Sequence, residues 1–180
     1  MKNVYLVGKA GAGKTSAASF LINNYGFRQA KFALPVYNLA YNYLDMKDKD
    51  RKLLQVLGTD VGRGLIDYNI WIRRFKEDMI IVERTRELMG MPKVTFILDD
   101  CRFPNEHNIL KELGWRGVYL EVPEEVRIWR LCGRDGDAKV ECLGHKSETE
   151  IDLFKDELIK VDADCVMEEM NSRLIKVLGL

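Results

Sequence analysis

The chain has 180 residues, a length typical of one domain with one hydrophobic core. Its 28 Lys and Arg residues balance 28 Asp and Glu residues, so no overall positive field is available to hold a nucleic-acid backbone. With 47% hydrophobic and 31% charged residues, the composition excludes a disordered protein, and any anionic ligand must be held locally.

Apolar patterning predicts alternating strands and helices in the first half of the chain. Residues 3–7 form an apolar, β-favouring run, and after a glycine-rich stretch residues 16–25 place apolar side chains at helical spacing. A short strand is predicted at residues 27–32. Helical spacing then continues from residue 34 to about residue 89, which predicts a long helical insertion between strands.

The second half continues the alternation. VTFILDD, residues 94–100, is an apolar run that ends in two acids, as in a parallel strand buried on both faces. Ser147 and Glu150 have the spacing of a capping box, which predicts that a helix begins there. The further predicted elements are a helix at 104–113, a strand at 117–122, a helix at 123–130, a loop at 133–144, a helix at 147–158, a strand at 164–167 and a helix at 172–178.

This order of elements predicts an α/β fold of three layers, with a five-stranded parallel sheet between helices. Such sheets bind ligands beyond the carboxyl ends of their strands. No run of about 18 apolar residues occurs, and residues 3–7 are too short for a signal peptide. We therefore expect a cytoplasmic protein with reduced cysteines and no membrane segment.

Residues 8–15 read GKAGAGKT and fit the pattern G-x-x-x-x-G-K-[ST] at every fixed position, between a predicted strand and a predicted helix. In such a P-loop, backbone N–H groups surround phosphate oxygens, Lys14 reaches the β- and γ-phosphates, and Thr15 offers a hydroxyl to Mg²⁺. A plain glycine turn explains neither of these two side chains. The residues expected to bind ATP are Gly8, Ala10, Gly11, Ala12, Gly13, Lys14, Thr15 and Ser16.

Three further segments follow the P-loop: LLQVLGTDVGRGLIDYNIWIRRF, ILDDCRFPNE and WRLCGRDGDAKVECLGHKSETE. No Asn-Lys-x-Asp motif of a GTPase switch occurs. Together and in this order, the segments resemble the bacteriophage deoxynucleoside monophosphate kinases, within the wider nucleoside monophosphate kinase group. The resemblance spans nearly the whole chain.

The resemblance implies the reaction dNMP + ATP → dNDP + ADP, with Mg²⁺, on a P-loop NTPase fold. It divides the single kinase domain into a core, residues 1–33 and 92–180, a helical NMP-binding insertion, residues 34–91, and a lid, residues 132–146. The expected partners are small nucleotides, not polymeric nucleic acid or a membrane. A homodimer is left open, and a phage-encoded protein would work in the host cytoplasm.

Phosphoryl transfer requires aligned phosphates and neutralised charge. Asp100, at the end of the strand beside the P-loop, is expected to hold a Mg²⁺ water or Thr15, with a turn cap as the alternative. Asp99 alternates to the other side of that strand and is the weaker candidate. Arg102 is expected to hold the acceptor monophosphate by a forked contact, with a surface salt bridge as the alternative.

In the insertion, the resemblance assigns Arg63 to the acceptor monophosphate, with a solvated surface arginine as the alternative. Asp67 and Trp71 are four residues apart and are expected to share one helical face. Trp71 would stack on the base and Asp67 would hydrogen-bond it, although a core position suits Trp71 equally well. Tyr37, Tyr41 and Tyr43 are candidates for lining the same pocket.

Arg127, Arg130 and Arg134 share one predicted helical face. A solvated stripe is the ordinary explanation. The resemblance instead places lid arginines over the transferring phosphate, so Arg130 and Arg134 join Lys14 and Asp100 as expected catalytic residues. Arg127 faces Glu124 one turn earlier and is expected to form a surface ion pair.

The HKSE segment, residues 145–148, matches a family signature, but the roles of His145, Lys146 and Glu148 stay open. Cys132, Cys142 and His145 lack the fourth ligand and the paired spacing of structural zinc sites, so no zinc is expected. Two alternatives to the resemblance remain. A dephospho-coenzyme A kinase would share the P-loop and sheet, and a non-catalytic ATP-binding module would need no lid arginines.

Overall fold

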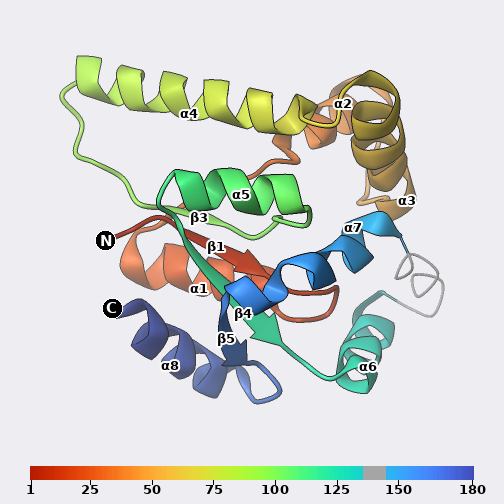
Figure 1. Ribbon diagram of the computed structural model, residues 1–180, viewed down its shortest axis with the longest axis vertical. Helices are drawn as coiled ribbons and strands as arrows, with labels where there is room; N and C mark the ends of the chain where they lie inside the picture. The colour runs from red at the N-terminus through yellow and green to blue at the C-terminus, as the bar shows by residue number, and fades with distance from the viewer. Residues whose placement is uncertain (136–144) are drawn as a thin grey trace. The chain divides into compact units, whose positions relative to one another are not determined.

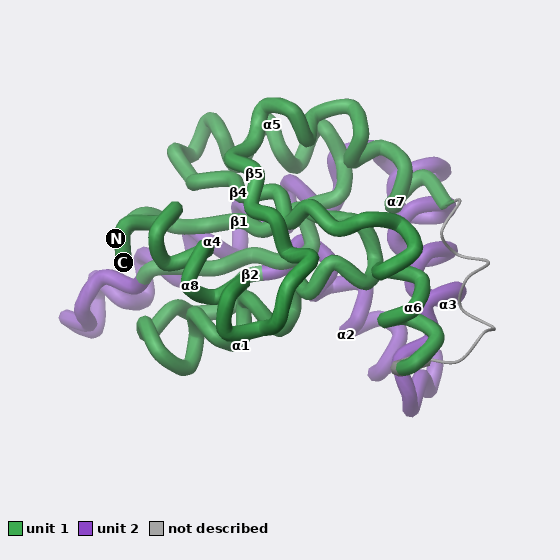
Figure 2. The backbone as a smooth tube through the Cα atoms, turned by 90° about the horizontal axis from the view of Figure 1, so that it is seen from below, with its two compact units in different colours: residues 1–30, 95–180 green, residues 31–94 purple. Residues whose placement is uncertain are grey.

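The computed structural model describes residues 1–135 and 145–180 of the chain. The chain forms two compact units, one of residues 1–30 and 95–180 and the other of residues 31–94 (Figure 2). Among the described residues, no helix has the length and apolar character needed to cross a membrane.

The first unit contains a five-stranded sheet in which every paired strand is parallel. The strand order is β2-β3-β1-β4-β5, so β1 is central (Figure 1). This arrangement confirms the predicted α/β class and the five-stranded parallel sheet. The strands are β1 Val4–Val7, β2 Arg28–Ala30, β3 Phe96–Leu98, β4 Arg116–Glu121 and β5 Ile159–Asp162.

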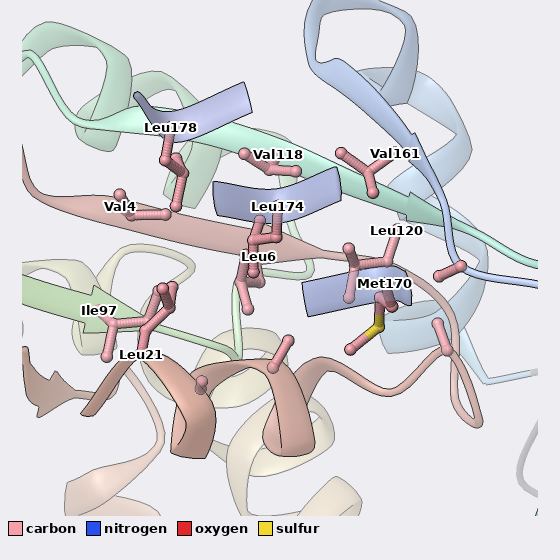
Figure 3. Close-up of a cluster of buried hydrophobic side chains, with 14 of the residues drawn as sticks. Val4, Leu6, Leu21, Ile97, Val118, Leu120, Val161, Met170, Leu174 and Leu178 are labelled. Carbon is pink, nitrogen blue, oxygen red and sulfur yellow. The ribbon is translucent and has the colours of Figure 1, made fainter. Parts of the chain in front are cut away.

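Helices cover both faces of this sheet. Helices α1 and α8 pack on one face through a core that includes Leu21, Leu174 and the inward side chains of β1 (Figure 3). Helix α5 lies on the other face (Figure 1). The helices of this unit are α1 Lys14–Tyr25, α5 Pro104–Glu112, α6 Glu124–Asp135, α7 Lys146–Thr149 and α8 Met167–Leu178, with the 3₁₀-helices η3 Glu150–Leu153 and η4 Lys155–Glu157.

The second unit is helical, as the spacing predicted for residues 34–89. Its elements are α2 Leu34–Tyr43, α3 Arg51–Gln55, the π-helix η1 Val56–Ile66 and α4 Ile70–Leu88. Part of its core is formed by Phe32 and Phe75, whose ring centroids lie 4.5 Å apart.

The strand predicted at residues 164–167 is wrong. The fifth strand is Ile159–Asp162, which pairs with β4, and Asp162 Oδ1 then accepts the N–H of Asp164 in a turn that leads into α8. The local apolar run at residues 165–167 therefore belongs to a turn and a helix start. Pairing with β4, a contact distant in sequence, selected the earlier segment instead.

The capping box predicted at Ser147 is also wrong. The N-cap of α7 is His145, whose Nδ1 accepts the N–H of Ser147 at 3.3 Å. Ser147 and Glu148 are buried inside this short helix, and 3₁₀ turns replace the predicted helix as far as residue 158. Tertiary contacts of Glu148, described below, outweigh the local capping pattern.

Candidate active site

The P-loop connects the central strand β1 to α1. Gly11 and Gly13 have φ angles of 83° and 85°, a left-handed conformation that side chains rarely adopt. Gly13 is the N-cap of α1, so the loop leads its backbone N–H groups to the positive end of a helix. This is the arrangement that the GKAGAGKT motif predicts.

Lys14 lies against this loop. Its Nζ donates to the carbonyl oxygen of Gly8 and, at 3.1 Å, to that of Lys9, and the side chain is buried. The ammonium group is therefore held by loop carbonyls, close to the N–H groups that face a phosphate in a P-loop.

Thr15 pairs with Asp99, not with Asp100. Its hydroxyl donates to Asp99 Oδ2 at 2.9 Å, and Gln29 Nε2 donates to Asp99 Oδ1 at 3.1 Å. The expectation that Asp100 holds Thr15 is thus corrected. Side chains alternate along a strand, and Ile97 packs in the core on the α1 side, so two residues later Asp99 faces α1 as well.

The Thr15 hydroxyl and the Asp99 carboxylate supply the hard oxygen ligands that Mg²⁺ prefers. Within the part of the chain that the structure describes, no group of three His, Cys, Asp or Glu side chains is arranged to hold a metal ion. His145 Nδ1 instead lies 3.1 Å from Ser147 Oγ, and Cys142 falls outside the described residues.

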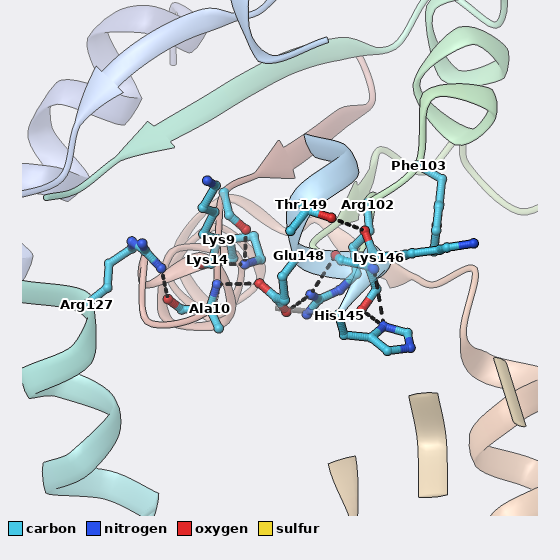
Figure 4. A network of polar contacts seen from close by, with 12 residues as sticks. Lys9, Ala10, Lys14, Arg102, Phe103, Arg127, His145, Lys146, Glu148 and Thr149 are labelled. Atoms are coloured by element: carbon cyan, nitrogen blue, oxygen red, sulfur yellow. Dashed lines mark hydrogen bonds and ion pairs between the residues drawn. The ribbon is translucent and has the colours of Figure 1, made fainter. Parts of the chain in front are cut away.

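Arg102 is held by two buried carboxylates. Its backbone N–H donates to Glu106 Oε2 at 2.7 Å, and its Nη1 donates to Glu148 Oε1 (Figure 4). Glu148 is 5% exposed. Burial alone raises the pKa of Glu148, but the charges of Arg102 and Lys14 and the N–H of Ala10 hold that pKa below its ordinary value.

The peptide groups that flank Ala10, in the middle of the P-loop, are bound on two sides (Figure 4). The N–H of Ala10 donates to Glu148 Oε2 at 2.8 Å, and its carbonyl oxygen accepts from Arg127 Nη1 at 3.2 Å. The phosphate loop is therefore anchored both to α7 and to α6.

Arg127 is not the surface residue that the sequence predicted. It is 7% exposed, and its pairing with Glu124 is a 3.9 Å contact to an exposed carboxylate. The helical spacing did not show that this face of α6 turns toward the P-loop. A Cβ atom added to Gly11 would lie only 2.6 Å from the Arg127 carbonyl oxygen, which shows how closely the two backbones approach.

Of the other two arginines of α6, the structure describes the side chain of Arg130 but not that of Arg134. Arg130 Nη2 donates to the carbonyl oxygen of Ala163 at 3.1 Å, in the loop after β5. Arg134 belongs to α6, which runs beyond the predicted end at Arg130, but its side chain lies outside the described part. Most of the predicted lid, residues 136–144, lies outside it as well.

In the helical unit, Arg63 is buried within η1 and its Nη1 donates to the Tyr68 carbonyl oxygen at 3.1 Å. Asp67 and Trp71 do not share a helical face, because Asp67 is extended at the end of η1 and α4 begins only at Ile70. Asp67 pairs with Arg73.

Trp71 is buried and its indole N–H donates to the Gly58 carbonyl oxygen at 2.7 Å. The ring also packs on Gly62, where an added Cβ would lie 2.5 Å from a ring carbon. Of the two positions left open by the sequence, the structure favours the core. Among the candidate tyrosines, Tyr37 and Tyr41 stack with ring centroids 6.2 Å apart.

Sequence reasoning missed three residues of this site. Glu106 and Glu148 lie within the quoted DDCRFPNE and HKSE segments but had no role, and Arg127 was treated as exposed. The available signal was the resemblance, because Glu106 belongs to the DCRFPNE element and Glu148 to the HKSE signature. Only the folded chain shows that all three contact the P-loop or Arg102.

Comparison of the sequence with known proteins finds a distant viral relative. A protein of Acanthamoeba polyphaga mimivirus described as "Putative deoxynucleotide monophosphate kinase" is 28% identical over an alignment that covers 94% of this chain and 92% of the viral protein. No protein-family model matches the chain.

Solved structures share the fold over 99% of this chain. They include a gluconokinase from Sinorhizobium meliloti 1021 (16% identity, TM-score 0.58, 91% of that chain covered), TT1252 from Thermus thermophilus (16%, 0.61, 97%) and a sugar kinase from Janibacter sp. HTCC2649 (18%, 0.56, 95%). At these identities the likeness concerns the fold alone. The chain therefore has a mixed α/β fold with a five-stranded parallel sheet, and solved structures that share this fold include a gluconokinase and a sugar kinase.

Proposed function

We propose that this protein transfers a phosphoryl group from ATP to a deoxynucleoside monophosphate, giving ADP and a deoxynucleoside diphosphate. The observation that carries the proposal is the link between the P-loop and a partly buried arginine through one buried carboxylate. Glu148 binds both the Ala10 N–H of the loop and the Arg102 guanidinium. A donor phosphate site and a candidate acceptor phosphate site thus adjoin.

The residues of the first unit divide the task between them. Lys14 and the N-terminus of α1 bind the donor phosphates, and Thr15 with Asp99 would hold Mg²⁺, which neutralises charge on those phosphates when bound. Arg102 binds the acceptor phosphate. Arg130, on the helix that anchors the loop, is proposed to act on the phosphoryl group in transit.

The choice of a deoxynucleoside monophosphate rests on two further grounds. The segments that follow the P-loop resemble the phage deoxynucleoside monophosphate kinases. The viral relative bears a deoxynucleotide monophosphate kinase description and aligns over nearly the whole chain. The role proposed for Arg63 is binding of the acceptor monophosphate, as the resemblance implies.

A coupled ADP-release assay with MgATP tests the proposal. The acceptors are the four common dNMPs, the matching NMPs, dephospho-coenzyme A and gluconate. We expect turnover with at least one dNMP and none with dephospho-coenzyme A or gluconate. The Lys14→Met variant lacks the ammonium proposed to bind phosphate and is the expected inactive control, with its folding checked by circular dichroism. Turnover of dephospho-coenzyme A without any dNMP would replace the proposal by the alternative kinase.

A further inference from the structure

Arg102 is held at its backbone and at its guanidinium. Glu106 Oε2 accepts the N–H groups of Arg102 and Phe103 at 2.7 and 3.1 Å, and Glu106 is 2% exposed. At the other end, Nη1 donates to Glu148 Oε1 and, at 3.3 Å, to the carbonyl oxygen of Ser147. An arginine bound in this way has a preset guanidinium position and loses little rotamer entropy when it meets a phosphate.

Glu148 uses its two oxygens for two different parts of the site. Oε1 binds Arg102, and Oε2 accepts the Ala10 N–H of the P-loop at 2.8 Å (Figure 4). Glu148 is buried while the Arg102 side chain is 30% exposed, so loss of Arg102 would leave a buried carboxylate without its guanidinium partner. A single carboxylate therefore bridges the loop and the Arg102 guanidinium.

We propose that Glu148 is a positioning residue that sets the separation between the P-loop and Arg102, and so aligns the donor and acceptor phosphates. The inference rests on the proposed function, because it takes Arg102 as the acceptor-phosphate group. Alignment supplies much of the rate in phosphoryl transfer. Nucleotide binding depends mainly on Lys14 and the N-terminus of α1, and the amide oxygen of a glutamine at position 148 can still accept the Ala10 N–H of the loop.

Glu148→Gln is the test variant, since glutamine keeps the shape and loses the charge. We expect kcat to fall about a hundredfold, the loss that misplacement by about 1 Å causes. The Kd for the non-hydrolysable analogue AMP-PNP should change by less than about threefold, because the loss concerns alignment and a threefold change is only about 0.65 kcal/mol. Parallel losses of kcat, affinity and melting temperature would show that Glu148 only holds the fold. Tighter AMP-PNP binding with unchanged kcat would show that Glu148 competes with phosphate, and would also overturn the proposal.

Asp152→Asn is the matched control. Asp152 is another carboxylate at the loop, but it contacts the Lys9 side chain at 2.7 Å in a partly exposed ion pair, and it touches neither Ala10 nor Arg102. Its loss removes the same charge from the same region without releasing Arg102. A hundredfold loss of kcat in this variant would show that the effect of Glu148→Gln comes from the loss of negative charge near the loop and not from the release of Arg102.

A double-mutant cycle shows whether Glu148 acts through Arg102. Arg102→Lys keeps the charge and loses the fork. If the two residues act together, adding Glu148→Gln to Arg102→Lys lowers kcat by less than about threefold further. If their roles are independent, the two losses of kcat multiply. Conversely, full multiplication of the two losses would overturn the positioning role.

Failure of the proposed function has a different signature. In that case the unaltered protein releases no ADP with any acceptor, and the cycle is measured on the free energy of unfolding in denaturant, which needs no turnover. Non-additive effects of the two variants on this free energy would support the contact between Glu148 and Arg102. Additive effects would overturn it independently of any substrate.

Discussion

Arg127 of α6 donates from Nη1 to the carbonyl oxygen of Ala10 at 3.2 Å, although the two residues are 117 positions apart in the sequence. The contact is buried, and the backbone of Arg127 also approaches Gly11 closely. Helix α6 therefore packs against the phosphate loop and hydrogen-bonds to it, in addition to any role of its other arginines.

Replacing Arg127 by alanine should destabilise the protein and weaken nucleotide binding together. The buried Ala10 carbonyl loses its donor, which costs about 1–3 kcal/mol. Since 1.4 kcal/mol is tenfold in affinity, we expect AMP-PNP affinity to fall about tenfold. Chemical denaturation and calorimetric titration measure the two effects.

Arg173→Ala is the control for this variant. Arg173 forms exposed ion pairs with Asp162 and Glu169 and lies on α8. Exposed pairs contribute about 0–1 kcal/mol, so its removal should leave nucleotide affinity unchanged. An Arg127→Ala protein as stable and as tightly binding as Arg173→Ala would show that the buried contact contributes nothing.

Gly11→Ala should be more damaging than Gly26→Ala. Both glycines have left-handed φ angles, 83° and 70°, so both variants pay about 1–2 kcal/mol of backbone strain. Only Gly11 faces another backbone, with the added Cβ 2.6 Å from the Arg127 carbonyl oxygen, whereas nothing lies within 4 Å at Gly26. We expect Gly11→Ala alone to lose nucleotide binding, as measured by titration with AMP-PNP. Equal behaviour of the two variants would contradict the tight approach of loop and α6.

Asp99→Asn should raise the Mg²⁺ concentration needed for half-maximal turnover. Asp99 accepts the Thr15 hydroxyl, and loss of a group that orients a metal ligand costs about ten- to a hundredfold in metal affinity. Asp100→Asn is the neighbouring control and should shift this concentration less. A larger shift for Asp100 would restore the role that the sequence first suggested for it.

Glu148 should contribute to the acid sensitivity of the fold. Although burial raises the pKa of Glu148, Arg102, Lys14 and the Ala10 N–H lower it below the unfolded value. Such a carboxyl stabilises the fold above its unfolded pKa, about 4.3, and this stabilisation is lost as the pH falls through the lower folded pKa. The free energy of unfolding should therefore drop more steeply below about pH 4.3 in the unaltered protein than in Glu148→Gln.

Denaturant titrations over the acid range measure this difference. Asp152 and Asp162, whose pKa values are also lowered, are present in both proteins and cancel in the comparison. Parallel pH profiles for the two proteins would mean that the Glu148 carboxyl has the same pKa in the folded and unfolded states.

Local patterns determined much of the fold. The P-loop motif, the buried run of β1 and the helix that begins at Pro104 depend on residues within a few positions of one another, so their spacing alone predicts them. The alternation of strands and helices then favours a parallel sheet, because a helix between two strands returns the chain to the end of the sheet where a parallel strand begins.

Contacts between distant segments decided the rest. Residues 159–162 and 164–167 each suit a strand locally, and pairing with β4 selects the first. In the same way, the choice of Asp99 over Asp100 depends on which face of β3 meets α1. The burial of Arg127 and Glu148 depends on the docking of α6 and α7 against the P-loop. A charged side chain has the same local spacing whether it faces water or a buried partner, so only tertiary packing distinguishes these cases.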